Sequence, residues 1–112
     1  MRVKSEDGLV GMGSCFTSGK LVEGSLELLW PSLKGQSAVE PERVTDTLRE
    51  STFWQGRGGA VEHAISGIDI ALWDIKGKAL GQPVCDLLGG RVRDSIPMYT
   101  GFGYFGGRDT PE

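Results

Sequence analysis

Aspartates and lysines in the middle of the chain are the residues whose types could support acid and base chemistry or metal binding. Asp69 and Asp74 are separated by four residues, and a helix turning about 100° per residue would place them about 140° apart around its axis. They therefore cannot act as a pair on one face. Asp74 precedes Lys78 by four positions, the favourable order for a helical ion pair, so structural roles are predicted. Lys76-Gly77-Lys78 falls where a helix C-terminus favours cations.

Cysteine and histidine chemistry is limited by the number of these residues. Cys15 and Cys85 lie far apart without a CxxC motif, and His63 is the single histidine. Neither a zinc site nor a Cys–His nucleophile can be assembled from them. Reduced thiols are expected, as in a cytoplasmic protein. The acidic residues also show no spacing typical of a carboxylate metal site, so this chain is predicted to bind no metal and no other cofactor itself.

Two glycine-rich runs could in principle bind an anion. Gly56-Arg57-Gly58-Gly59 precedes a predicted helix and could hold an anion, but a joint between two helices explains the glycines as well. Residues 101–106 match GxGxxG, yet bulky Phe102 and Phe105 stand where a pyrophosphate would approach, so a nucleotide site is not expected. The net charge of -3 with scattered basic residues argues against a nucleic-acid or anionic-membrane binder. No apolar run is long enough to span a bilayer, and the signal-peptide pattern is missing.

The element that must position these residues is a long helix predicted over residues 60–80. Its apolar side chains recur at spacings of one, three and four, which gathers them on one broad face; they are Val61, Ala64, Ile65, Ile68, Leu72, Ile75 and Ala79. Gly67, Ile70 and Gly77 extend that face around the side. Only a narrow polar line remains, so this helix is predicted to be central, with partners on several sides.

The residues before this helix predict a hairpin and two further helices. Residues 2–5 and 9–13 are predicted to form two strands joined through Glu6-Asp7-Gly8, because Asp-Gly between two such runs is a strong hairpin signal. A lone hairpin is marginally stable, so we expect a sheet that lacks a strand at its amino end. A helix starting near Thr17 or Ser18 is predicted to end or bend at Pro31; its inward residues are Leu21, Val22, Leu26, Leu29 and Leu33. The next helix opens at Pro41, buries Val44 and Leu48, and runs out near Phe53 and Trp54.

After the long helix, the pattern predicts a stop, a short helical turn and a strand. Gly81-Gln82-Pro83 ends the helix, and residues 84–90 form one capped turn. Residues 96–100 are then predicted to begin a strand. The whole chain fits a single α+β domain in which an antiparallel hairpin, the remnant of a three-stranded sheet, packs on a three-helix cluster.

Three runs of the sequence, residues 53–59, 64–84 and 87–90, closely resemble the amino-terminal capping domain of the enolase superfamily, in its mandelate racemase and muconate lactonizing subgroup. The resemblance covers essentially the whole chain. It implies that residues 1–95 are the capping domain without its first strand. Residues 96–112 would then begin a truncated (β/α)7β barrel. At the hairpin end this chain has Gly11-Met12-Gly13-Ser14, where the family often has Gly-Trp-Gly-Glu.

In that subgroup the barrel domain carries the chemistry. The resemblance implies a full-length parent, a lyase or isomerase, that binds Mg²⁺ on barrel carboxylates and removes a proton α to a substrate carboxylate with a lysine or histidine base. Acid sugars or hydroxy acids are the implied substrates, undergoing dehydration, racemisation or cycloisomerisation. No catalytic residue falls in this chain, which alone should be inactive. Its partners would be its own barrel domain and the small-molecule substrate, in a cytoplasmic parent that is a homo-oligomer.

The resemblance carries over to two segments that border the active-site mouth. In the loop 15–20, Phe16 would form part of the wall, Thr17 would hydrogen-bond and Lys20 would attract a carboxylate. Thr100 and Phe102 would lie at the carboxyl end of a barrel strand, where barrel enzymes place their sites. The alternative is a non-catalytic helical module for interaction or dimerisation. The strand and glycine-aromatic run after residue 95 favour the enzyme, because such a module would not need them.

Overall fold

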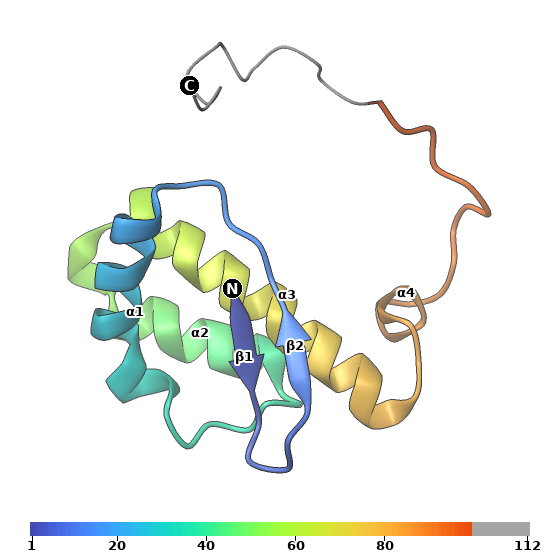
Figure 1. Cartoon of the computed structure of the whole chain (residues 1–112), viewed down its shortest axis with the longest axis horizontal. Coiled ribbons are helices and arrows are strands. Elements are labelled where there is room, and N and C mark those ends of the chain that lie inside the picture. The colour runs from blue at the N-terminus through green and yellow to red at the C-terminus, as the bar shows by residue number, and fades with distance from the viewer. Residues whose placement is uncertain (100–112) are drawn as a thin grey trace, which may run out of the picture.

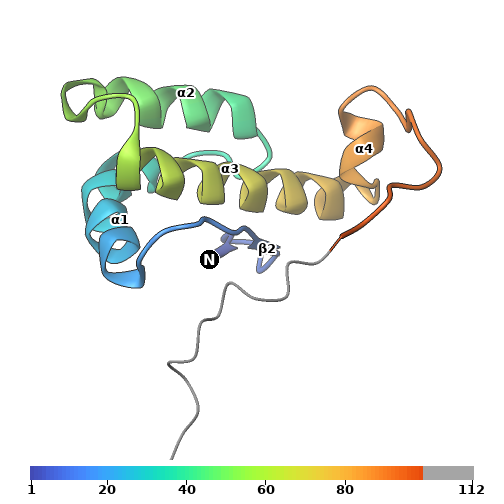
Figure 2. The same cartoon turned by 90° about the horizontal axis from the view of Figure 1, so that it is seen from above.

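A computed structural model describes residues 1–99 of the chain (Figure 1). Within this range the elements are β1 (Arg2–Lys4), β2 (Val10–Met12), α1 (Gly19–Leu33), α2 (Pro41–Ser51), the 3-10 helix η1 (Phe53–Gln55), α3 (Gly59–Leu80) and α4 (Val84–Leu87). Their order confirms the predicted α+β fold. Figure 2 shows α3 in the middle, with α2 on one side and the hairpin on the other.

The hairpin forms as its turn residues predict. β1 and β2 are antiparallel, with Val3 opposite Gly11. The Ser5 N–H donates to the Leu9 carbonyl at 2.9 Å, and Gly8 closes the turn with a φ of 91°. A positive φ at this point is available to glycine without strain, which explains why Asp-Gly marks the turn.

The core lies where α3 meets α1 and α2. The fully buried side chains include most of the apolar face predicted for α3, together with one residue of α1 and two of α2: Leu29, Val44, Leu48, Ala64, Ile65, Ile68, Leu72 and Ile75. Three residues predicted to face the core are exposed: Leu21 is 54% exposed, Ile70 is 45% exposed, and Ala79 is also exposed. Four others are only partly buried, namely Val22, Leu26, Leu33 and Val61. The core contacts α1 through Leu26, Leu29 and Leu33. Leu21 is exposed because it lies more than a turn earlier in α1, before this contact begins.

Glycines allow β2 to approach α3 unusually closely. A methyl group at Gly11 would overlap the Ala71 carbonyl oxygen, and one at Gly13 would overlap the Gly67 carbonyl oxygen. Gly11 and Gly13 share one face of the strand, and Gly67 and Ala71 are one helical turn apart. The strand therefore rests backbone against backbone on the helix, and any larger residue would lift it away.

Helix α3 ends as predicted. Gly81 adopts the left-handed conformation with a φ of 64°, and the Gln82 N–H donates to the Gly77 carbonyl at 2.9 Å, the pattern of a glycine-capped helix end. The short helix α4 follows. Within residues 1–99, no helix combines the length and apolar character needed to cross a bilayer.

Residues 96–99 do not form the strand expected there. No strand is present in this segment, and the side chains of Ile96, Met98 and Tyr99 are 77%, 90% and 93% exposed. A strand needs a hydrogen-bonded neighbour, and no element in the described range pairs with this segment. Thr100, with the remainder of the expected strand, lies outside the described residues, so the assignment to a barrel stays a prediction.

Candidate functional site

Three of the five predicted site residues lie in the loop between β2 and α1 and in the first turn of α1. Phe16 projects into solvent with 91% of its surface exposed, Thr17 is half-buried, and Lys20 is exposed in the first turn of α1. The loop is fixed at both ends: the Gly13 N–H donates to the Met1 carbonyl at 3.1 Å, and the Val22 N–H donates to the Ser18 carbonyl at 3.1 Å. The sequence prediction thus places an aromatic, a hydroxyl and a cation on one short surface segment. The two other predicted site residues, Thr100 and Phe102, lie outside the described residues.

Asp69 and Asp74 each make structural contacts, with different partners. The Thr45 hydroxyl donates to Asp69 at 2.8 Å, which ties α2 to α3. Asp74 accepts from the Lys78 ammonium at 2.7 Å and from the Met12 N–H at 2.9 Å. These hydrogen bonds, the one from Lys78 first, lower the pKa of the Asp74 carboxyl. The predicted ion pair between Asp74 and Lys78 is confirmed, and neither aspartate is free for acid and base chemistry.

The described residues do not supply ligands for Mg²⁺. Among residues 1–99, no three histidine, cysteine, aspartate or glutamate side chains gather where they could hold a metal ion. The implied ion therefore does not fit the part of the chain seen here. Cys15 and Cys85 are half-buried free thiols.

The glycine-rich loop 56–59 joins η1 to α3, as the helix-joint interpretation predicts. Gly56 and Gly59 both have positive φ values, 86° and 70°. Beside the loop, Phe53 and Trp54 form an edge-to-face pair with ring centroids 5.4 Å apart, and Trp54 is 91% exposed.

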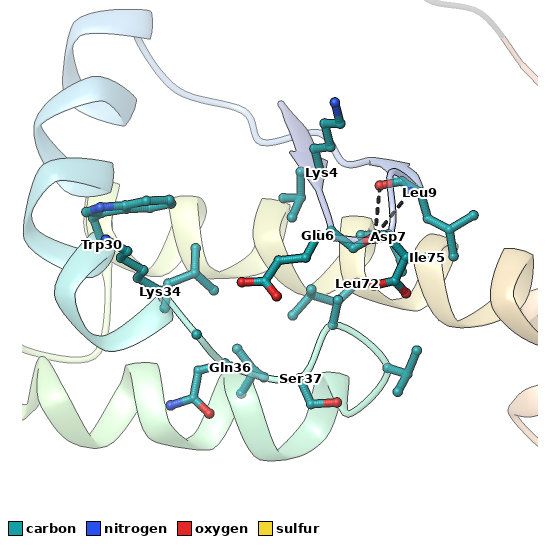
Figure 3. Close-up of a pocket in the computed structure, with 17 residues that line it drawn as sticks. Lys4, Glu6, Asp7, Leu9, Trp30, Lys34, Gln36, Ser37, Leu72 and Ile75 are labelled. Atoms are coloured by element: carbon teal, nitrogen blue, oxygen red, sulfur yellow. Dashed lines mark hydrogen bonds between the residues drawn. The ribbon is translucent and has the colours of Figure 1, made fainter.

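A cavity of about 570 Å³ lies beside β1, away from the predicted site loop (Figure 3). Its walls come from β1 and the hairpin turn, the end of α1, and the connection to α2; buried Val44, Leu72 and Ile75 reach it from the core. Lys4 and Lys34 are the basic residues around it. No sequence signal pointed to this cavity, because its lining comes from segments far apart in the chain.

The two edges of the hairpin differ. Met1 and Ser5 make their main-chain hydrogen bonds to β2, so the register turns the main-chain groups of Arg2 and Lys4 outward, toward the cavity side. No hydrogen bond from the described residues reaches them. On the opposite edge, side chains of α3 bond to β2.

These elements define a small α+β domain. Its hairpin packs through glycines on the long central helix α3, further helices lie behind α3, and the loop between β2 and α1 is on the surface. The chain belongs to the family described as "Mandelate racemase / muconate lactonizing enzyme, N-terminal domain", which it matches over residues 1–89. The resemblance noted in the sequence is thereby confirmed, and its relatives and structural neighbours are members of the enolase superfamily.

Similar curated proteins include D-galactonate dehydratases and members of their family. The chain is 44% identical over 111 residues to a D-galactonate dehydratase family member of Paenibacillus sp. (strain JDR-2), covering 96% of this chain and 26% of that protein. It is 41% identical over 108 residues to the D-galactonate dehydratase of Variovorax paradoxus (strain S110), covering 92% and 27%. The chain therefore spans about a quarter of the length of these relatives.

Solved structures agree on the fold. The 3,6-anhydro-D-galactonate cycloisomerase from Zobellia galactanivorans superposes with a TM-score of 0.75 at 35% identity, over 80% of this chain and 25% of that one. A mandelate racemase/muconate lactonizing protein from Paracoccus denitrificans PD1222, complexed with magnesium, gives 0.72 at 36% identity, over 82% and 26%.

Proposed function

We propose that this chain is the capping part of an acid-sugar dehydratase of the enolase superfamily. The observation that carries the proposal is the identity of 41–44% to two D-galactonate dehydratases and a member of their family, across nearly the whole chain. Dehydration of a 2,3-dihydroxy acid starts with removal of the proton α to the carboxylate. Loss of the β-hydroxyl as water then leaves an enol, which becomes a 2-keto-3-deoxy acid.

In this proposal the chain binds and encloses substrate, and another domain performs the chemistry. Phe16 forms an apolar wall, Thr17 hydrogen-bonds a substrate hydroxyl, and Lys20 attracts the carboxylate. The 91% exposure of Phe16 supports a partner surface or ligand at this loop, because a large aromatic gains stability when it is covered. Thr100 and Phe102 join this site at the end of the barrel strand. Mg²⁺ would be bound by residues other than those described.

The exposed segment after α4 supports docking onto a barrel domain. Leu88, Val92, Ile96, Met98 and Tyr99 are 66%, 93%, 77%, 90% and 93% exposed. Such a run of large apolar side chains is favoured where another surface covers it. We infer that residues 96–112 begin this barrel domain, with residues 1–95 as the cap, in a cytoplasmic homo-oligomer.

The open edge of β1 and the adjoining cavity support the expected third strand of the sheet. Arg2 and Lys4 turn their main-chain groups toward that side, and an added strand would pair with them. Its inward side chain would enter the cavity against Leu72 and Ile75.

The test is turnover by the full-length protein. D-galactonate, L-rhamnonate and other acid sugars are incubated with the enzyme, with Mg²⁺ and with a chelator, and α-keto acid formation is followed. The proposal predicts Mg²⁺-dependent formation of a 2-keto-3-deoxy acid from at least one of them, and none from the 112-residue chain alone. Absence of keto acid from the whole panel, or isomerisation without loss of water, would contradict it.

A further inference from the structure

The main chain at the outer edge of β2 bonds to charged side chains of α3 instead of to another strand. In the antiparallel register, Gly11 faces Val3 on β1, while Val10 and Met12 turn their main-chain groups away from β1. At the edge of a sheet such groups normally bond to water or to another strand.

Asp74 and Lys78, one turn apart on α3, occupy this edge. The Asp74 carboxylate accepts the Met12 N–H at 2.9 Å, as the carbonyl of a neighbouring strand would. The Lys78 ammonium donates to the Val10 carbonyl at 2.7 Å, as a neighbouring N–H would, and also to Asp74 at 2.7 Å. The ion pair thus substitutes for a neighbouring strand, because each of its two side chains bonds both to the other and to the main chain of β2.

This contact lies where the chain leaves β2. Met12 is the last residue of the strand, and the loop with Phe16 and Thr17 follows directly. Gly11 and Gly13 lie close against the backbone of α3, and the hydrogen bonds at Val10 and Met12 tie the outer edge of the strand to the same helix.

We infer that Asp74 and Lys78 are positioning residues, which fix the outer edge of β2 and thereby hold the loop 14–18 in place for substrate. The inference rests on the proposed function for its kinetic consequence. Neither side chain belongs to the loop, and each acts only through the main chain of β2.

The experiment uses the full-length enzyme with Lys78→Met, which keeps the aliphatic stem and removes the donor. Loss of charge-assisted hydrogen bonds should raise the KM for the acid sugar about tenfold. The kcat should stay within about twofold, because the loop contributes binding shared by ground and transition states. Lys78→Arg retains donors for both acceptors and should restore most of the KM. Asp74→Asn, which keeps the side-chain shape, should also raise the KM.

A matched control is Glu62→Gln on the same helix. Glu62 pairs with Arg49 at 2.8 Å with a side-chain exposure of 34%, close to the 33% of Asp74, but its partner is on α2. The Glu62→Gln variant should leave the KM unchanged. Circular dichroism is used to show that all variants are folded. An unchanged KM in folded Lys78→Met, or an equal rise in Glu62→Gln, would overturn the inference.

Amide hydrogen exchange tests the same inference without turnover. Exchange of residues 12–18 should accelerate in Lys78→Met and stay as in the wild type in Glu62→Gln. Unchanged exchange in Lys78→Met would refute the positioning role even if the enzyme is active. A wild type that turns over no acid sugar, with faster exchange in the variant, would instead refute only the proposed function.

Discussion

Substituting Gly11 by alanine tests whether the close contact between β2 and α3 determines the architecture. The new methyl group would overlap the Ala71 carbonyl oxygen and would lie 2.8 Å from both the Ala71 carbonyl carbon and Ile75 Cγ1, whereas ordinary van der Waals contacts begin at 3.4 Å. The Ala71 atoms belong to the backbone of a buried helix and cannot rotate away. The strand must therefore move.

The expected cost follows from what that movement breaks. Overpacking of a close-packed interior costs about 1–3 kcal/mol. Displacing β2 also stretches the hydrogen bonds from Met12 to Asp74 and from Lys78 to Val10, each contributing on the order of 1 kcal/mol. We expect Gly11→Ala to lower the free energy of unfolding by about 3–5 kcal/mol, a large part of the roughly 5–15 kcal/mol typical of a domain.

The assay is urea unfolding of the 112-residue chain, followed by helical circular dichroism. Gly24→Ala is the matched control: Gly24 is an exposed glycine inside α1 with nothing within 4 Å of an added methyl. Because alanine favours helix, this control should stabilise by about 0.5–1 kcal/mol. A loss below about 1 kcal/mol in Gly11→Ala would refute the reasoning about close packing.

Three further predictions concern single side chains. Hydrogen bonds lower the pKa of Asp74 from 3.8, so the stabilising effect of the ionised carboxylate is present above pH 3.8 and is lost as the pH falls through the folded-state pKa. The melting temperatures of Asp74→Asn and wild type should therefore converge in acid and separate at neutral pH. A difference that stays constant with pH would contradict this. Thr45→Val removes the donor to Asp69 and should cost about 1–3 kcal/mol in urea unfolding, whereas Thr47→Val, at a more exposed bond to Arg43, should change stability by less than about 0.5 kcal/mol; equal effects would argue against a special role for Thr45. Phe16→Ala should leave stability within about 0.5 kcal/mol, because the ring is 91% exposed, and should raise the KM of the full-length enzyme severalfold; an unchanged KM would remove Phe16 from the site.

Most of the secondary structure could be predicted because its signals are local. The apolar periodicity of residues 60–80, the Asp-Gly turn at Gly8 and the glycine stop at Gly81 each act within a few residues. The ion pair of Asp74 and Lys78 was likewise visible as an i, i+4 spacing.

Features that depend on distant segments could not be predicted. The sequence shows that Asp74 can reach Lys78, but it does not show that both bond to a strand more than sixty positions away. The need for glycine at Gly11 arises from the Ala71 carbonyl, and the cavity arises where several elements meet. Burial of Leu21 was wrongly expected because periodicity identifies a face but not how far the neighbouring element extends.

The most direct test of the account is the fate of the substrate proton in the full-length enzyme. Acid sugars are turned over in D₂O with Mg²⁺, and the product is analysed by NMR and mass spectrometry. Proton abstraction α to the carboxylate followed by loss of water predicts a 2-keto-3-deoxy acid carrying one solvent deuterium at C3, placed there when the enol becomes the ketone. Recovery of substrate that is unchanged, or of a product that retains all its oxygens, would contradict the assignment of this chain to an acid-sugar dehydratase.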